Sequence, residues 1–185
     1  TPFSMDAIHI SEWFDYICDH YFAEFSFDRS QIEVQWSHNM VWYSGKTEYP
    51  TASSATIMMN KKLLEMLPLE ETVETYIHEA IHAILHVTKR EYNGDPDHGD
   101  AFMREARRIQ AINPHLDHLH IATPDYMEQV NTIKKYHWKC SDKCARTNIP
   151  ELAGYVDAGG WVSRARNKAP GKGEPRWNDH VKLCG

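Results

Sequence analysis

The chain has 185 residues, 42% of them hydrophobic and 25% charged, and its net charge at pH 7 is −6. A chain of this length can bury a core of its own, and the composition is typical of a soluble globular protein. No apolar run approaches the roughly 18 residues that a membrane-spanning helix needs, so the sequence excludes a protein that crosses a membrane on helices. Residues 1–4 hold no basic region ahead of an apolar stretch, and we therefore expect no signal peptide.

Helix and strand patterns alternate along the first two thirds of the chain. Apolar residues at helical spacing predict helices over residues 5–22, 61–66, 70–88 and 98–112. Alternating polar and apolar residues predict a strand over residues 31–36, and β-forming residues predict two more strands between residues 40 and 59. Residues 92–97 combine Asn, Gly, Asp and Pro, which is typical of a loop.

The charge is distributed unevenly between the two ends of the chain. Residues 1–130 hold 9 Lys and Arg against 21 Asp and Glu, a net charge of −12, and residues 131–185 hold 11 against 5, a net charge of +6. We take this change as a boundary between a domain over residues 1–130 and a small subdomain over residues 131–185. A basic segment is suited to polyanions, but charge alone does not separate this interpretation from a merely solvated lysine-rich surface.

The helix predicted over residues 70–88 carries an HExxH motif, His78-Glu79-Ala80-Ile81-His82. Residues four apart on an α-helix lie about 40° apart around the axis and about 6 Å apart along it, so both imidazoles can bind one ion. Glu79 points to the side, where it can reach a water molecule on the metal and act as general base. A chance match in a His-rich chain is the alternative. The apolar stripe on the rest of the helix and a further His across the next loop favour a catalytic zinc site instead.

The third zinc ligand is predicted to be His98 rather than His86. His86 continues the same helical face, but ligands from three successive turns would strain tetrahedral coordination. His98 follows the predicted loop and opens the next helix, which can fold back over the first, and Gly99 permits a close backbone approach. We expect His86 to be a partly buried polar residue. Three more histidines, His115, His118 and His120, are expected at the surface, and the sequence does not decide whether they bind metal.

A second zinc site is predicted near the C-terminus. Its candidate ligands form a C-x3-C pair and an H-x3-C pair joined by a longer loop, and they are Cys140, Cys144, His180 and Cys184. Two close pairs of this kind are typical of a structural zinc site, and zinc could supply folding energy to a segment this polar. The alternative is a set of free thiols in a disordered tail. The fourth cysteine, Cys18, lies in an apolar helical pattern and is expected in the core.

Aromatic and basic residues alternate inside the long loop of this second site. They are Tyr155, Trp161, Arg164, Arg166, Lys168, Arg176 and Trp177. Aromatic faces stack on unpaired bases and cations neutralise phosphates, so the combination suits single-stranded nucleic acid. The alternative is that the rings form the small core around the zinc ion, and for Trp177 both can hold.

Taken together, these motifs resemble those of the SprT-like metalloproteases. The HExxH motif followed by His98-Gly99-Asp100-Ala101-Phe102 is similar to the HExxH and H-G-x-x-F elements of that family. The paired ligands near the C-terminus, with Gly154-Tyr155-Val156 and Trp177 between them, resemble the zinc-binding subdomain of the Spartan branch. Residues 33–37 also resemble the first strand of that branch, and the likeness covers about residues 10–185.

The resemblance implies an α+β, zincin-like SprT domain, with helices packed on a small mixed sheet, and a small C-terminal zinc-binding subdomain. It implies a nuclear, chromatin-associated endopeptidase that DNA activates and that degrades proteins covalently crosslinked to DNA. His78, His82 and His98 would bind the catalytic zinc ion, Glu79 would be the general base, and Tyr155 and Trp177 would bind single-stranded DNA. We thus expect two zinc ions, DNA and DNA-bound protein substrates, and no membrane. Ubiquitin, the sliding clamp and a segregase are expected only through flanking regions outside this chain.

Two departures from the Spartan pattern bear on the shape of the expected DNA groove. Residues 40–54 lack the cysteine-bearing strand that is usual in that branch, and Gly159-Gly160-Trp161 resembles a local insertion. Two other functions stay open. One is a nucleic-acid-binding adaptor with an idle metal centre, against which Glu79 counts because an idle site needs no base. The other is a zinc peptidase that does not use DNA, which the −12 charge of residues 1–130 favours.

Overall fold

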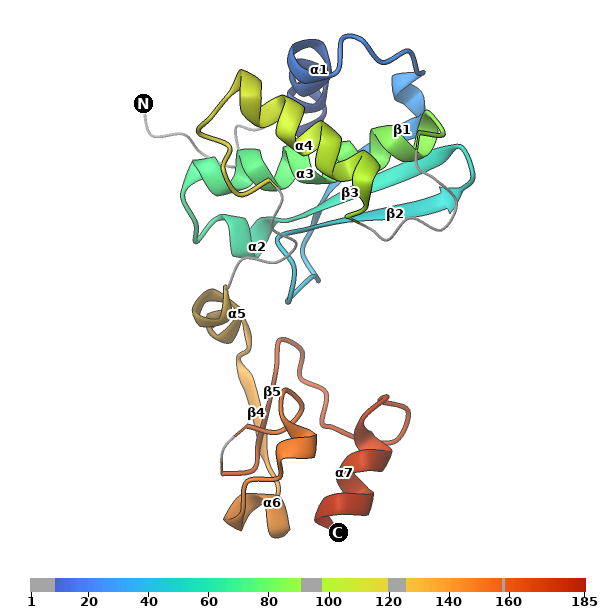
Figure 1. Ribbon diagram of the computed structural model, residues 1–185. Coiled ribbons are helices and arrows are strands. Elements are labelled where there is room, and N and C mark those ends of the chain that lie inside the picture. Colours follow the sequence, from blue (N-terminus) through green and yellow to red (C-terminus); the bar gives the residue numbers. More distant parts are fainter. Residues whose placement is uncertain (1–8, 91–97, 120–125, 158) are drawn as a thin grey trace. The chain divides into compact units, whose positions relative to one another are not determined.

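The computed structural model describes residues 9–90, 98–119, 126–157 and 159–185. The chain forms two units, residues 1–125 and residues 126–185 (Figure 1). Helix α5, Met127–Ile133, runs across the boundary expected after residue 130. The domain limits of 1–130 and 131–185 therefore stay a prediction. The loop predicted over residues 92–97 lies outside the described residues.

The first unit is built on a three-stranded mixed sheet. Its strands are β1 (Ile32–Ser37), β2 (Gly45–Thr51) and β3 (Ser54–Asn60), in the order β1-β3-β2. β1 runs parallel to β3, while β2 pairs with β3 in the antiparallel direction. Side chains alternate between the faces of a strand, and the alternate residues Ala55, Ile57 and Met59 of β3 are buried. These three residues are the contribution of β3 to the hydrophobic core.

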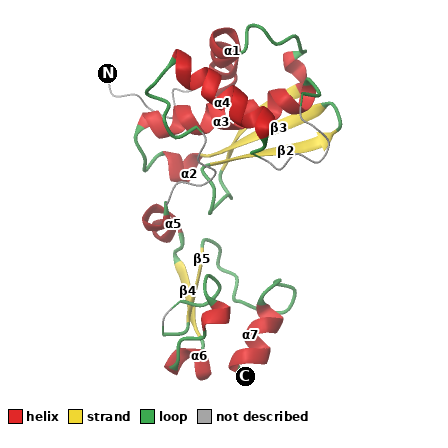
Figure 2. Cartoon of the chain, in the orientation of Figure 1, coloured by secondary structure: helices red, strands yellow, loops and turns green. Residues whose placement is uncertain are grey.

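Helices cover the sheet and complete the core of this unit. They are α1 (Ile10–Tyr21), α2 (Lys61–Leu64), α3 (Leu69–Val87) and α4 (Asp100–Ile112), with a 3-10 turn, η2 (Arg29–Gln31), before β1. α3 packs on β3 and β2, α4 packs on α3, and α1 packs on β1 (Figures 1 and 2). Cys18 lies in this core, as predicted. The predicted α+β class, with helices on a small mixed sheet, is confirmed, and no helix in the described ranges is long and apolar enough to cross a membrane.

The second unit has short elements and a small core of its own. After α5 come β4 (Tyr136–Lys139), α6 (Lys143–Arg146), the 3-10 turn η3 (Pro150–Leu152), β5 (Trp161–Arg164) and α7 (Trp177–Cys184). β4 and β5 form an antiparallel pair. Among the described residues, the core of this unit contains Cys144, Ile149, Leu152, Val156, Val162 and Cys184. Gly160 has φ +82°, and a Cβ atom there would lie 2.7 Å from Ala145 Cα, so only glycine allows this approach to α6.

Asn60 joins β3 to the segment that leads into β2. Its side chain is fully buried, and its Nδ2 donates a hydrogen bond to the Tyr43 carbonyl at 2.8 Å. Its Oδ1 accepts from the backbone N–H of Leu63 at 3.2 Å and so caps α2. Its backbone N–H donates to the Ser44 carbonyl at 2.8 Å. These bonds fix the chain immediately before Gly45, the first residue of β2.

Replacing Asn60 with Ala should therefore lower the free energy of unfolding by about 2 kcal/mol, because the helix loses its cap and a buried carbonyl loses its donor. The midpoint of urea-induced unfolding, followed by circular dichroism, measures this loss. Asn39→Ala, at an exposed position of the same unit, serves as the matched control and should leave the midpoint unchanged. Equal midpoints for the two variants would contradict this account of Asn60.

Candidate metal centres and their surroundings

Three histidines converge above the middle of α3. His78 and His82 lie one turn apart on α3, and His98 precedes α4, which packs against α3. The Nε2 atom of His98 lies 3.0 Å from Nε2 of His78 and 3.3 Å from Nε2 of His82. Two nitrogen ligands of a tetrahedral zinc ion, each about 2.0–2.1 Å from the metal, lie about 3.3 Å apart. The spacing of these three nitrogens thus fits a zinc ion.

The protonation of the histidines also suits a metal. His78 Nδ1 donates a hydrogen bond to the Leu119 carbonyl at 2.8 Å, which leaves the lone pair of Nε2 directed at the cluster. Burial lowers the pKa of His78 to about 4 and that of His82 to about 3. Both imidazoles are thus neutral at pH 7, which is the form that binds metal. The lone pairs of three closely spaced nitrogen atoms repel one another, and a bound zinc ion would replace this repulsion with coordination bonds.

The Phe102 ring packs against all three histidine rings. Its ring centroid lies 4.8 Å from that of His78, 4.5 Å from that of His82 and 4.7 Å from that of His98. It is 2% exposed and comes from the first turn of α4. The Phe of the H-G-x-x-F element therefore packs the cluster from the same helix that His98 precedes.

Glu79 lies beside the cluster and is held by β2. Its Oε2 accepts a hydrogen bond from Thr47 Oγ1 at 2.7 Å, and the same hydroxyl lies 3.1 Å from the Glu79 backbone carbonyl. Burial raises the pKa of Glu79 to about 7, and the Thr47 hydroxyl acts in the opposite direction. A carboxyl group with a pKa near neutrality is suited to take and return a proton.

Gly45 makes room for the Glu79 side chain. A Cβ atom at position 45 would lie 2.7 Å from Glu79 Cγ, 2.8 Å from Thr75 Cγ2 and 3.0 Å from Glu79 Oε1. Contacts this short force neighbouring atoms to shift, so any side chain at this position would displace the carboxylate. The close approach of β2 to α3 thus requires glycine here.

His86 lies outside the histidine cluster. It sits two turns along α3 from His78, where its Nε2 contacts the Thr51 carbonyl at 2.9 Å and its ring stacks on Tyr49 with centroids 4.3 Å apart. His115 is exposed, and His120 lies outside the described residues. His118 lies near Glu74 and Asp117 rather than near the three converging histidines.

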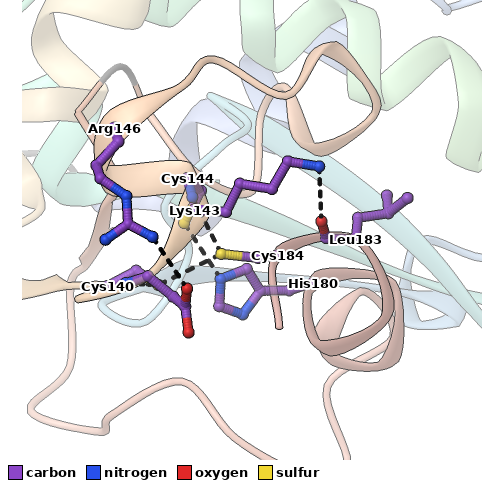
Figure 3. A network of polar contacts seen from close by, with 8 residues as sticks. Cys140, Lys143, Cys144, Arg146, His180, Leu183 and Cys184 are labelled. Atoms are coloured by element: carbon purple, nitrogen blue, oxygen red, sulfur yellow. Dashed lines mark hydrogen bonds and ion pairs between the residues drawn. The ribbon is translucent and has the colours of Figure 1, made fainter.

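The four ligands predicted near the C-terminus come together around α6 and α7 (Figure 3). Cys140 follows β4, Cys144 lies in α6, and His180 and Cys184 lie one turn apart on α7. The Sγ atoms of Cys140 and Cys184 are 3.6 Å apart, and Cys144 Sγ lies 3.4 Å from His180 Nε2. Zn–S bonds of about 2.3 Å place two sulfur ligands about 3.8 Å apart in a tetrahedron. All four cysteines of the chain are free thiols, so this donor set fits zinc.

Backbone N–H groups support the sulfur atoms of this second cluster. The N–H of Cys144 donates to Cys184 Sγ at 3.1 Å, and the N–H of Asp142 donates to Cys140 Sγ at 3.4 Å. Burial alone would raise the pKa of Cys184, but the Cys144 N–H and the neighbouring thiols bring this pKa below its ordinary value. Such bonds favour the thiolate form that binds metal.

Tyr155 and Arg164 share one acidic partner in the second unit. Glu174 Oε2 accepts a hydrogen bond from Tyr155 Oη at 2.9 Å and pairs with Arg164 Nη2 at 2.6 Å. The Arg164 guanidinium lies 5.4 Å from the centroid of the Tyr155 ring. Burial and this hydrogen bond raise the pKa of Tyr155 to about 12. Two of the predicted DNA-binding side chains are therefore fixed within the unit itself.

The other predicted DNA-binding residues divide into anchored and exposed ones. The rings of Trp177 and Tyr155 lie 5.7 Å and 6.0 Å from the His180 ring, so both border the cysteine–histidine cluster. Arg176 donates to the carbonyls of Ala153, at 2.7 Å, and of Glu151. Trp161 is 41% exposed, with Lys139 Nζ 5.4 Å from its ring centroid.

Arg166 and Lys168 are exposed. Within the described part of the chain, neither side chain makes a hydrogen bond or an ion pair.

Sequence reasoning missed the groups that orient the site residues. Thr47, Gly45 and the Leu119 carbonyl lie more than 30 residues from the residues that they support, and nothing in the HExxH motif indicates them. Gly45 lies in the glycine-bearing stretch between the strands predicted from residues 40 to 59, and a glycine at a strand can signal close backbone approach, so the sequence could have drawn attention to it. Glu174 carries no comparable signal.

Comparison with known proteins identifies the family of this chain. Residues 10–125 match the SprT-like family. The chain is 31% identical over 158 residues to DNA-dependent metalloprotease SPRTN of Xenopus tropicalis. It is 33% identical over 159 residues to DNA-dependent metalloprotease dvc-1 of Caenorhabditis elegans. It is 30% identical over 159 residues to DNA-dependent metalloprotease SPRTN of Homo sapiens. These alignments cover 83–84% of this chain but only 33%, 39% and 29% of the respective relatives. Since the family match covers more than half of its length, this chain belongs to the SprT-like family.

Proposed function

We propose that this chain contains the catalytic unit of a zinc-dependent endopeptidase whose activity depends on DNA. The observation that carries the proposal is the convergence of three histidine Nε2 atoms beside the Glu79 carboxylate. The relatives carry the name DNA-dependent metalloprotease, which supports both the metal and the DNA dependence. Two zinc ions are proposed, the first on His78, His82 and His98 and the second on Cys140, Cys144, His180 and Cys184.

The chemistry proposed for the first cluster is hydrolysis of a peptide bond. Zinc bound by the three histidines would supply Lewis acidity toward a water molecule and the scissile carbonyl. Glu79 takes a proton from the attacking water and returns it to the leaving amine, as its pKa of about 7 allows. Because Thr47 engages Oε2, the carboxylate keeps one orientation during both transfers. An idle adaptor would have no use for this arrangement.

The second unit is proposed to bind single-stranded DNA. Arg166 and Lys168 are exposed and suited to phosphates, and Trp161 offers an exposed ring for stacking on a base. Tyr155 and Trp177 are partly exposed beside His180, so a base can approach rings that the metal cluster and Glu174 hold in place. Arg164 and Arg176 would act by shaping this surface, since they bind other groups of the unit.

The proposed substrates are proteins covalently crosslinked to DNA, and the proposed location is nuclear chromatin. A protease that is active only when it is bound to DNA degrades proteins that are attached to the same DNA. The name DNA-dependent metalloprotease of the relatives is consistent with such an activity. The acidic charge of residues 1–130 favours one competing function, a zinc peptidase that does not use DNA.

A cleavage assay separates these functions. The chain is incubated with a DNA-binding protein as substrate, with and without single-stranded DNA, beside Glu79→Gln. We expect cleavage only when DNA is present and none by Glu79→Gln, whose zinc content should equal that of the unmodified chain. Equal cleavage without DNA would support the DNA-independent peptidase, and cleavage by Glu79→Gln would refute the role of Glu79.

Gly45→Ala should slow cleavage about a hundredfold without loss of zinc. The added methyl group forces the Glu79 carboxylate from its position, and a displacement of about 1 Å costs a factor of this order. Rates of single turnover, with zinc measured by mass spectrometry, test the expectation. Gly171→Ala is the control because a Cβ atom at position 171 meets nothing within 4 Å. If Gly45→Ala cleaves at the unmodified rate, Gly45 has no part in positioning Glu79.

Removing the charges of Arg166 and Lys168 should weaken binding of single-stranded DNA and make it less dependent on salt. Each lost phosphate contact lowers the slope of log affinity against log salt by about 0.7, so Arg166→Gln with Lys168→Gln should lower it by about 1.4. Lys62→Gln with Arg104→Gln removes the same charge from exposed positions of the first unit and serves as control. An equal loss in both double variants would mean that net charge, rather than this segment, sets the affinity.

A further inference from the structure

A buried carboxylate lies on α3 one helical turn before His78. Glu74 is 7% exposed, and its Oε2 atom is buried without a hydrogen-bond partner in the described part of the chain. Leaving one oxygen of a buried carboxylate without a partner is costly, and a bound ion is one of the explanations for such an atom in a native protein. The chemistry proposed for the histidine cluster does not use Glu74.

Two exposed ligand-type side chains face Glu74 from the segment that follows α4. His118 Nδ1 lies 3.5 Å from Glu74 Oε2, and His118 Nε2 lies 3.7 Å from Asp117 Oδ1. With one ligand atom from each residue, Glu74, Asp117 and His118 have ligand atoms that all lie within 4.8 Å of one another. Glu71 also approaches, with Oε1 3.9 Å from His118 Nδ1.

We propose that Glu74, Asp117 and His118 form a third, exchangeable binding site for a divalent cation of the zinc class, with Glu71 as an additional ligand. One imidazole and several carboxylates form a donor set that suits zinc, whereas calcium and magnesium prefer oxygen ligands alone. The side chains of Asp117 and His118 are 72% and 49% exposed, so they can close around the ion by changing rotamer. The same exposure leaves the ion open to exchange.

A protonated His118 that merely pairs with acidic neighbours explains these contacts less completely. An ion pair at 3.5 Å leaves Oε2 of Glu74 without a hydrogen bond, and Asp117 adds a further negative charge to a carboxylate pair already on α3. Burial raises the pKa of Glu74, while the backbone N–H and imidazole of His118 act in the opposite direction. A cation with two charges neutralises this group of carboxylates better than one imidazolium.

The proposed site lies next to a support of the histidine cluster. Leu119, the residue after His118, provides the carbonyl that accepts the hydrogen bond from His78 Nδ1. A cation held between α3 and residues 117 and 118 would fix this segment on α3 and so restrict the Leu119 carbonyl. The third site thus stabilises the orientation of His78 from a position one turn away.

Zinc binding to the whole chain tests the proposal. Free zinc is buffered over the micromolar range, and bound zinc is measured by mass spectrometry for the unmodified chain, Glu74→Gln and His118→Ala. We expect both variants to bind one ion fewer per chain than the unmodified chain, or to bind the weakest ion at least about tenfold less tightly. His115→Ala changes an exposed histidine of the same segment outside the group, and it should bind as the unmodified chain does.

The readout is a difference between chains, so it stays separate from the two sites of the proposed function. Failure of those sites would lower zinc binding equally in every variant, whereas failure of the third site would leave the unmodified chain and His118→Ala identical. As a second measurement, zinc titrated after the tight sites are filled should shift the ring resonances of His118 in NMR spectra and leave those of His115 in place. No shift at His118, or equal binding by the unmodified chain and His118→Ala, would overturn the proposal.

Discussion

The site depends on one constraint, the burial of polar groups on a helix that is otherwise part of the core. α3 holds Ile77, Ala80, Ile81 and Ile84 in the interior and directs His78, Glu79 and His82 toward β2 and α4. Burial removes water from these groups, which keeps the imidazoles neutral and raises the pKa of Glu79. Each group then needs a partner from the protein, and the Leu119 carbonyl and the Thr47 hydroxyl are such partners. The sheet order β1-β3-β2 and the packing of α3 on β2 bring Thr47 close enough to reach Glu79.

The second unit is subject to a different constraint, because its short elements bury too little apolar surface to stabilise one another by packing alone. Six of its described residues form the buried core, and two of them, Cys144 and Cys184, are candidate metal ligands. A bound ion would tie the end of β4 and α6 to α7, although 30 residues separate α6 from α7. The cysteine–histidine cluster and the apolar core share Cys144 and Cys184, and Tyr155 packs against that core while its hydroxyl is held by Glu174. A surface held this firmly loses little conformational entropy when it binds a ligand.

What could be predicted from the sequence followed from local spacing. His78 and His82 share one helical face whatever surrounds them, and the two ligand pairs near the C-terminus repeat this logic. His98 was predicted as the third ligand because a loop precedes it and the helix that it opens can fold back over α3. The supporting groups could not be predicted, because Thr47 reaches Glu79 only through the strand order β1-β3-β2 and the register of β2. The elements of the second unit were not predicted either, since segments of four to eight residues carry too little periodicity. The pairing of Arg164 with Glu174 could not be predicted either, because nothing in the sequence distinguishes an arginine that pairs within the unit from one that is free to bind DNA.

The division of charge bears on how DNA dependence would arise under the proposed function. Residues 1–130 carry a net charge of −12, so this part of the chain repels a polyanion, and residues 131–185 carry +6. Attraction to DNA must then come from the second unit, and a protein substrate reaches the histidine cluster only if it is held near the same DNA. The acidic charge that first favoured a DNA-independent peptidase is therefore compatible with a DNA-dependent one, because the proposed function assigns catalysis and DNA binding to different units.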